Sequence, residues 1–476
     1  MWVDFFYWTF LLAYAVIVFS TMWVVVLENR QPAKTIAWLV VLTFIPIVGL
    51  VVFYFFGQSL RKERFINRRT YNVLTHNMLL EQQSQPLPEV PEKYERLVNL
   101  MLRKNHAVAT DANRVEVLNS GRDYLQALLR DIHSARHHIH IETYIIEDDA
   151  VGRLLRDALI DKAREGVEVR FLYDDVGCWN VSDKFFDSFA QGGIDIHPFL
   201  PVRFPSLTHK VNYRNHRKLC VIDGMVGYIG GMNFALRYVS ERMPHWRDMQ
   251  LRLKGQAVGS LQRIFLIDWC YVTGKELLHR KFFPSVAQET TERRKALLQI
   301  VCSYPVSEYP ELMYGITCAI QHARKYLYIQ TPYFLPTEPV LQALQSAAMS
   351  GVDVRLMLPK KTDSFWLRWG NDSFLMDVLK AGVRVYHYEG GFLHTKALVA
   401  DDDWCSVGSA NMDFRSFDNN FEANAFVYEP TVAKQVKAEF LKDLADSQEV
   451  LPEKWKARSY GHRLMESSTR LLSPLL

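Results

Sequence analysis

The sequence predicts an α/β protein of two duplicated lobes with pseudo-twofold symmetry, preceded by an N-terminal hairpin of two transmembrane helices. Two uncharged apolar runs near the N-terminus, a repeated strand–helix–strand pattern and a repeated short motif lead to this prediction. We therefore expect a hairpin anchor over residues 1–60 and a basic juxtamembrane segment and linker over 61–108. A first lobe over 109–288 and a second lobe with a C-terminal tail over 289–476 should follow.

The two apolar runs, residues 5–27 and 35–60, contain no charged residue. A helix needs about 20 apolar residues to cross a bilayer core, so each run is long enough. Pro46 and Gly49 within the second run are compatible with a membrane helix. Basic residues are concentrated at 61–69, directly after the second run, which predicts that the N-terminus and both lobes lie on the cytoplasmic side. A buried hairpin in a soluble protein is the alternative.

The rest of the chain contains one pattern twice. Each copy has an apolar strand, a helix with apolar side chains on one face, a glycine that ends the helix and a second strand. In that order, the parts are 135–144, 154–159, Gly166 and 167–170, and then 323–333, 340–348, Gly351 and 352–355. A strand, helix and strand of this length form a β-α-β unit with parallel strands. We expect the two lobes to contribute equivalent residues to a site at their common axis.

Each copy leads into the motif H-x-K-x4-D, followed by an asparagine 17 residues after the histidine. The motif residues are His216, Lys218, Asp223 and Asn233 in the first copy, and His394, Lys396, Asp401 and Asn411 in the second. On a strand, side chains two residues apart point to the same face, so each histidine should project together with its lysine.

These residue types suit phosphoryl transfer. An imidazole can move protons near neutral pH or attack as a nucleophile, whereas an ammonium and an amide can bind phosphate oxygens. One His-x-Lys pair often arises by chance, but two in register within a duplication indicate a catalytic site. The aspartates Asp223 and Asp401 are included among the catalytic candidates, although each stands where a strand meets a turn and could instead cap it.

This constellation resembles the phospholipase D superfamily over residues 110–445. The resemblance implies a two-step, metal-free transfer that needs no cofactor. His216 is assigned as the nucleophile that forms a phosphohistidine, and His394 as the acid that protonates the leaving alcohol and then deprotonates the incoming one. The near symmetry of the motifs leaves the reverse assignment open. Lys218, Lys396 and the two asparagines would hold the phosphoryl oxygens.

The resemblance also implies a carboxylate that braces each motif histidine from a downstream position. The candidates are Asp248 for the first copy and Glu422 for the second, each expected to serve the histidine of its own copy. Such a carboxylate would fix the imidazole tautomer and raise its basicity. A carboxylate on the surface or in a hairpin is the alternative.

Within the superfamily, the chain is similar to the bacterial cardiolipin synthases in its double apolar N-terminus, residues 29–57, residues 381–396 and the apolar end 471–476. That resemblance implies transfer of a phosphatidyl group from one phosphatidylglycerol to another, with release of glycerol, at the bacterial inner membrane. Anionic membrane lipids would be its partners. The alternatives are a phospholipase D or other phosphatidyltransferase that uses water or another alcohol, a nuclease, and a non-catalytic lipid-binding scaffold.

Composition and residue patterns bear on which partners and metal sites are expected. With 56 basic and 52 acidic residues the net charge is only +4, which gives no support for a nucleic-acid partner. The six cysteines form no C-x-x-C pair, so we expect buried reduced thiols and no zinc site. Aromatic and basic residues mix at 199–214 and 365–369, where contact with a membrane interface or packing in the core are both open. Homo-oligomer formation also stays open.

Overall fold

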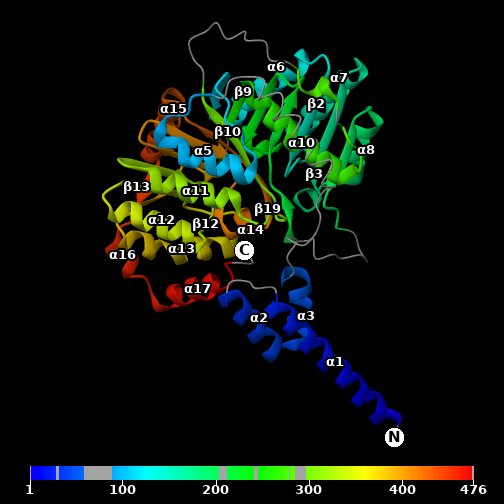
Figure 1. Ribbon diagram of the computed structural model, residues 1–476, viewed down its shortest axis with the longest axis vertical. Coiled ribbons are helices and arrows are strands. Elements are labelled where there is room, and N and C mark those ends of the chain that lie inside the picture. The colour runs from blue at the N-terminus through cyan, green and yellow to red at the C-terminus, as the bar shows by residue number, and fades with distance from the viewer. Residues whose placement is uncertain are drawn as a thin grey trace. The chain divides into compact units, whose positions relative to one another are not determined.

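The computed structural model describes residues 2–27, 32–57, 88–202, 212–240, 245–277, 279–284 and 296–473 (Figure 1). They belong to two units, Met1–Lys62 with Val202–Asn212, and Glu63–Pro201 with Tyr213–Leu476, and each unit is considered by itself. The basic cluster predicted at 61–69, residues 81–87 of the linker and residues 203–211 of the mixed aromatic and basic segment lie outside the described residues.

In the N-terminal unit, α1 (Trp2–Leu27) is the one helix of the described residues that is long and apolar enough to cross a membrane. The second apolar run is divided into α2 (Pro32–Phe44), α3 (Pro46–Val52) and the π-helix η1 (Phe53–Gly57). The break falls at Pro46, which has no N–H to donate and therefore interrupts the helical hydrogen bonds. Side chains of Val25, Leu42 and Phe53 pack together where these helices meet.

The larger unit contains two mixed β-sheets in which seven strands follow a corresponding order, and the second sheet has an additional strand, β20, at its edge. The first runs β1-β9-β7-β6-β2-β3-β4, and the second runs β10-β19-β17-β16-β11-β13-β14-β20. The strands of the first sheet are β1 (Asn113–Leu118), β2 (His138–Thr143), β3 (Glu168–Asp174), β4 (Asp195–Phe199), β6 (Leu219–Ile222), β7 (Val226–Gly230) and β9 (Gln250–Gly255). Those of the second are β10 (Leu298–Ser303), β11 (Tyr326–Gln330), β13 (Asp353–Pro359), β14 (Arg384–Tyr388), β16 (Ala397–Ala400), β17 (Trp404–Gly408), β19 (Asn420–Val427) and β20 (Ser447–Glu449). We call the lobes built on them lobe 1 and lobe 2.

The predicted β-α-β units are present in both lobes. β2 pairs in parallel with β3, and β11 with β13, through the helices α7 (Ala150–Arg164) and α12 (Glu338–Met349). Gly166 and Gly351 follow these helices with φ of 91° and 96°, a conformation that glycine adopts without steric cost. The other half of each sheet is antiparallel, which the repeated pattern did not predict.

Helices cover both sheets (Figure 1). The remaining helices of lobe 1 are α6 (Gly121–Ser134), α8 (Asp183–Gln191), α9 (Leu236–Val239), α10 (Ala257–Thr273) and the 3-10 helices η3 (Val176–Cys178) and η5 (Arg280–Phe282). Those of lobe 2 are α11 (Glu311–His322), α13 (Phe365–Lys380), α14 (Phe414–Asp418), α15 (Pro430–Ala445), α16 (Pro452–Lys456) and α17 (Tyr460–Leu471). α10 packs on the first sheet and contacts β10, while α15 packs on the second and contacts β1, so each helix joins the two lobes. All six cysteines are buried and none forms a disulfide.

One helix lies where only a juxtamembrane segment and linker were expected. α5 (Glu92–Asn105) buries Tyr94, Leu97, Val98 and Met101, which share one face of the helix, in the core of lobe 2. The spacing of these apolar residues is the signal that identifies such a helix in a sequence. The chain therefore contributes to lobe 2 before it enters lobe 1.

Candidate active site

Each H-x-K motif lies in the short connection between two strands. His216 and Lys218 stand between β5 (Arg214–Asn215) and β6, and the second motif stands between β15 (Phe392–Leu393) and β16. β6 and β16 belong to the sheets of their own lobes, but β5 and β15 do not. The motif residues therefore lie where the chain passes from one lobe to the other.

The strands before the motifs are exchanged between lobes. β5, from the first half of the chain, pairs with β19 of lobe 2, and His216 N donates to Phe421 O at 3.0 Å. β15, from the second half, pairs with β8 (Trp246–Arg247), and His394 N donates to Arg247 O at 2.7 Å. These two pairings bring each motif histidine next to the strand that carries the other half's carboxylate.

The prediction that each carboxylate serves the histidine of its own copy is therefore wrong. His216 Nδ1 lies 3.0 and 3.1 Å from the two carboxylate oxygens of Glu422. His394 Nδ1 lies 2.6 Å from Asp248 Oδ2. The physical reason is the exchange of β5 and β15, because it places each histidine on the opposite lobe. In both histidines Nδ1 is engaged, which leaves Nε2 as the atom available for chemistry.

The paired groups form one electrostatic cluster rather than two separate sites. Burial, then Lys396, Lys218 and His216, lower the pKa of His394 well below its usual value. Burial lowers the pKa of His216 to about 4, with Glu422 opposing this shift. Each histidine thus responds to charges from both halves of the chain.

The pKa values of the lysines and carboxylates are also shifted by burial and by neighbouring charged groups. Burial lowers the pKa of Lys218 well below its usual value and that of Lys396 to about 8. Burial raises the pKa of Asp248 to about 6. Burial also acts to raise the pKa of Glu422, but His216 and Lys218 outweigh it and the net shift is downward. An anion bound among these groups would favour the charged lysines and histidines.

Both lysine ammonium groups bend back on their own motif. Lys218 Nζ donates to His216 O at 2.5 Å, and Lys396 Nζ donates to His394 O. The two asparagines differ from each other. Asn233 accepts from Ile145 N at 3.1 Å and donates to Tyr238 Oη at 2.7 Å, whereas the amide oxygen of Asn411 is buried without a hydrogen-bond partner. The two halves of the site are thus alike in their charged groups and different in their amides.

The motif aspartates lie at the far ends of β6 and β16 and do not join the histidines. Asp223 accepts hydrogen bonds from the backbone N–H groups of Arg136, His137 and His138, at 2.8 to 2.9 Å. Asp401 accepts from those of residues 324–326 at 2.8 to 3.0 Å. Their inclusion among the catalytic candidates is therefore corrected: both carboxylates bind the backbone at the start of a neighbouring strand, and both have positive φ angles of 53° and 58°.

This geometry predicts a loss of stability rather than of chemistry when Asp223 is replaced. Asp223→Ala leaves three N–H groups without their acceptor and should lower the free energy of unfolding by about 2 kcal/mol. Asp223→Asn is the matched control, since asparagine tolerates the left-handed conformation and keeps one acceptor oxygen. Thermal unfolding and turnover at low temperature would be measured together. A folded Asp223→Ala protein without turnover would contradict the structural role.

Aromatic side chains and hydroxyls complete the surroundings of the histidines, and the motif spacing did not identify most of them. The Trp246 ring lies 4.9 Å from that of His394, and Tyr238 Oη lies 3.4 Å from His394 Nδ1. Ser409 and Ser416 both donate to the Glu422 carboxylate, Ser409 at 2.5 Å and Ser416 at 2.9 Å. They keep that carboxylate ionised and fixed. The motif did not predict a role for Ser416, because Tyr238, which stands at the same separation of 22 residues from its motif histidine, is a different residue type.

Two side chains, one at the end of β2 and one directly after it, lie near the first motif but in different surroundings. The Tyr144 ring lies 4.9 Å from that of His216, and Lys218 Nζ lies 5.2 Å from the centre of the Tyr144 ring. Glu142 instead accepts from Asn215 and is fully buried, and burial raises the pKa of its carboxyl well above the usual value. Tyr144 therefore borders the site, and Glu142 belongs to the packed junction behind it.

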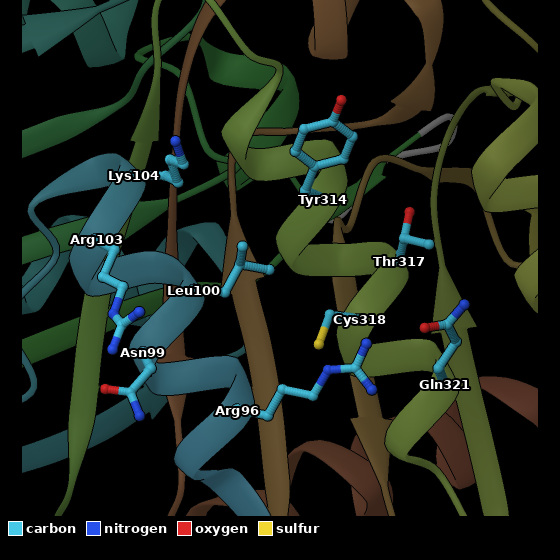
Figure 2. A pocket seen from close by; sticks show the side chains of 9 residues that line it. All are labelled: Arg96, Asn99, Leu100, Arg103, Lys104, Tyr314, Thr317, Cys318 and Gln321. Carbon is cyan, nitrogen blue, oxygen red and sulfur yellow. The ribbon is translucent and has the colours of Figure 1, made fainter.

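A groove of about 580 Å³ lies elsewhere, between α5 and α11 (Figure 2). It is lined by Arg96, Asn99, Leu100, Arg103, Lys104, Tyr314, Thr317, Cys318 and Gln321. Figure 2 shows the Arg96 side chain extending from α5 toward Cys318 on α11. None of the motif residues or their carboxylates lines this groove, so it is separate from the candidate active site.

The chain matches the family model described as the phospholipase D-like domain of cardiolipin synthase twice, over residues 128–269 and 316–444. It also matches the model described as phospholipase D-nuclease N-terminal, over residues 12–58. Among solved structures, phosphatidylserine synthase of Haemophilus influenzae Rd KW20 has a TM-score of 0.60 at 14% identity, covering 81% of this chain and 100% of that one. The fold and the doubled motif thus define a phosphatidyltransferase of the phospholipase D superfamily.

Curated relatives narrow the class. The chain is 39% identical to the major cardiolipin synthase ClsA of Bacillus subtilis (strain 168), over 94% of this chain and 95% of that protein. It is 39% identical to cardiolipin synthase 2 of Bacillus anthracis, over 95% and 89% of the two chains. Cardiolipin synthase of Geobacillus sp. (strain WCH70) is 38% identical, over 95% and 91%. The chain belongs to the bacterial cardiolipin synthase family.

Proposed function

We propose that this enzyme transfers a phosphatidyl group from one phosphatidylglycerol to the glycerol hydroxyl of a second, forming cardiolipin and releasing glycerol. The observation that carries the mechanism is the pair of buried imidazoles, each held through Nδ1 by a carboxylate from the opposite half of the chain. A fixed Nδ1–H leaves a lone pair on Nε2, which is the form that His216 needs as the nucleophile. His394 must instead start as the imidazolium, protonated on both nitrogens, and the negative charge of the bound phosphodiester favours this form.

The first step breaks the bond between phosphorus and the leaving glycerol oxygen. His216 Nε2 attacks phosphorus and forms a P–N bond, while His394 Nε2–H gives its proton to the departing oxygen. In the second step His394 takes the proton from the glycerol hydroxyl of the second phosphatidylglycerol. That oxygen attacks phosphorus, the P–N bond breaks, and both histidines return to their starting states. The reverse assignment of the two histidines would use the same bonds.

Positive charge for the phosphoryl oxygens comes from Lys218 and Lys396, with Asn233 and Asn411 beside them. Both ammonium groups are buried, where electrostatic interactions are stronger than in water. This supports a transfer that needs no metal ion. The orphan amide oxygen of Asn411 and the proximity of Tyr144 to His216 support a contribution of these polar groups to substrate binding.

The anchor is proposed to be a two-span hairpin of residues 1–60, with the N-terminus and both lobes in the cytoplasm. α1 is long enough for one span, and α2, α3 and η1 continue as helix through residues 32–57 apart from the break at Pro46. The segments 61–108, 109–288 and 289–476 remain the proposed divisions of the rest. The two sheets support a boundary between lobes near residue 288, and α5 supports a structural link from the linker segment to lobe 2.

The product distinguishes this function from that of a hydrolase. Purified enzyme in vesicles, given phosphatidylglycerol labelled in its free glycerol, should produce cardiolipin and release labelled glycerol in equal amounts. Water as the acceptor would give phosphatidic acid instead, because hydrolysis of the same intermediate yields that lipid. Phosphatidic acid as the main product in intact vesicles would overturn the proposed acceptor while leaving the superfamily chemistry in place.

The dependence of kcat/KM on pH should report Lys396. Because its pKa is about 8, the free enzyme loses the ammonium charge as pH rises through that value, and binding of the phosphodiester should weaken. We therefore expect kcat/KM to fall above about pH 8. Lys396→Arg keeps its charge, since arginine is protonated at all working pH values. In this variant the fall of kcat/KM should therefore move to higher pH. If kcat/KM of Lys396→Arg fell at the same pH as that of the parent enzyme, the fall would be caused by another group.

A further inference from the structure

α17, near the C-terminus, packs against lobe 2 with its polar face. Arg470 Nη1 donates to Asp377 Oδ2 of α13 at 2.7 Å, and the His462 ring lies 5.3 Å from that of Trp369. Glu466, which is buried, accepts from Arg458 Nε at 2.8 Å. The side of α17 that touches the protein is therefore made of ion pairs and polar contacts.

The opposite face of α17 is apolar and exposed. Tyr460, Leu464 and Leu471 are 78%, 54% and 83% exposed. Residues four and seven apart lie above one another on a helix, so these three form a stripe along its outer side. A helix on the surface of a soluble domain normally shows the reverse arrangement, with its apolar face inward. This reversal indicates that something apolar covers the stripe.

A second group of exposed apolar side chains lies on the first turn of α13, the helix that packs against α17. Phe365 and Trp366 are 60% and 49% exposed. The Phe365 ring lies 6.1 Å from that of Trp369, which in turn contacts His462 at the start of α17. We call this set the α13–α17 apolar surface, and it consists of Phe365, Trp366, Tyr460, Leu464 and Leu471. Two packed helices thus each present large exposed apolar side chains, which is more than isolated surface residues explain.

Exposed charged residues that are near these side chains in the sequence, or lie on α16, which packs against α13, are mostly cationic. They are Lys361, Arg368, Lys454, Lys456 and Arg463, against the carboxylates Asp363 and Glu453. Aromatic and leucine side chains bordered by lysine and arginine match the interface of an anionic bilayer, with apolar groups among the acyl chains and cations on headgroup phosphates. A second copy of the chain is a poorer occupant, because a twofold contact would bring the same cations against each other.

We propose that the α13–α17 apolar surface inserts into the interfacial region of an anionic phospholipid bilayer. This contact is separate from the membrane span of α1 and comes from the opposite end of the chain. It holds lobe 2 directly on the lipid surface, so that the catalytic unit does not depend on the N-terminal helices alone for its position. The inference rests on the proposed function only in that the substrate is a membrane lipid.

The test uses the full chain in vesicles that contain phosphatidylglycerol. Leu464→Cys is labelled with a polarity-sensitive fluorophore, which is selective because the six native cysteines are buried. With lipids that carry a spin label near the headgroup, the emission at residue 464 should be quenched at least twofold. The matched control is Leu441→Cys on α15, a leucine 42% exposed in a helix away from α17 in Figure 1, which should not be quenched.

Each alternative occupant gives a different result. Energy transfer between labels on two chains without lipid quenching would identify a second copy. A shielded emission that neither lipid nor a second chain changes would identify contact with another part of the same chain. Either result, or an emission like that of residue 441, would overturn the proposal.

Activity provides a second readout. Leu464→Glu combined with Leu471→Glu should lower cardiolipin formation in phosphatidylglycerol vesicles at least fivefold and leave turnover of a water-dispersed short-chain phosphatidylglycerol nearly unchanged. An equal loss on both substrates, or no loss on vesicles, would count against the membrane contact. Continued cardiolipin formation in a protein whose surface is not quenched would reject this inference without affecting the proposed function.

Discussion

Replacing His216 or His394 by alanine should each abolish cardiolipin formation, with turnover falling by about 10⁴-fold or more. One imidazole must bond to phosphorus and the other must carry the proton, and neither can do both at once. The loss should be as large in either single variant as in the double variant, because residues that act as a unit are not additive. Labelled phosphatidylglycerol in vesicles and separation of the lipid products measure this directly.

The matched control is His133→Ala, which removes an exposed imidazole on α6 and should leave turnover near that of the parent protein. Rapid quenching of the parent enzyme in an alkaline denaturant should trap a phosphohistidine, because its P–N bond is stable in alkali and labile in acid. Loss of this species in His216→Ala but not in His394→Ala would support the assigned roles, and the opposite result would exchange them. Near-normal turnover in either alanine variant would rule out the two-histidine mechanism.

The crossed carboxylates should have the second largest effect. Glu422→Gln and Asp248→Asn preserve shape but no longer fix the tautomer of the histidine or stabilise its charged form. A fall in turnover of about 10² to 10⁴-fold is expected, as for similar carboxylate–imidazole pairs. Glu449→Gln on β20 is the matched control, because Glu449 pairs with Arg384 at 2.9 Å and touches no histidine.

The crossing itself can be tested apart from the loss of activity. In protein with ¹⁵N-labelled histidine, Glu422→Gln should change the imidazole resonances and pH titration of His216, and Asp248→Asn those of His394. A merely structural role would not select one histidine in this way. If Glu422→Gln altered His394 and left His216 unchanged, the exchange of β5 and β15 would be wrong.

Much of the fold could be read from local patterns. The β-α-β units, their glycines and the two H-x-K motifs depend on residues close together in the sequence, where spacing determines which side chains share a face. The antiparallel hairpins β6–β7 and β16–β17 join neighbouring segments. The other antiparallel pairings, such as β2 with β6 and β10 with β19, join distant segments that no short-range pattern specifies. α5 has a recognisable apolar face, but its packing partners come much later in the chain, as in the hydrogen bond from Gln299 Nε2 to Val98 O, whose sequence separation is 201.

The candidate site shows the same limit. The family pattern predicts that Glu422 and Asp248 brace the motif histidines. Nearness in the sequence pairs each carboxylate with the wrong histidine, because the true pairs are crossed between the two halves. β5 and β15 have only two residues each, too few for any periodic signal. For the motif aspartates the local sequence was informative. Their position between a strand and a turn indicated that Asp223 and Asp401 could bind backbone N–H groups, and the structure contains these hydrogen bonds.

The exchanged strands have a further consequence for how the catalyst is assembled. If the two lobes were separate molecules, neither would hold a working histidine, and activity would rise with the square of their dilute concentration. Covalent linkage makes the meeting of the halves independent of how many copies the cell contains. It also allows the residues around each histidine to diverge in sequence. Glutamate with two serines surrounds His216, whereas aspartate and a tyrosine surround His394.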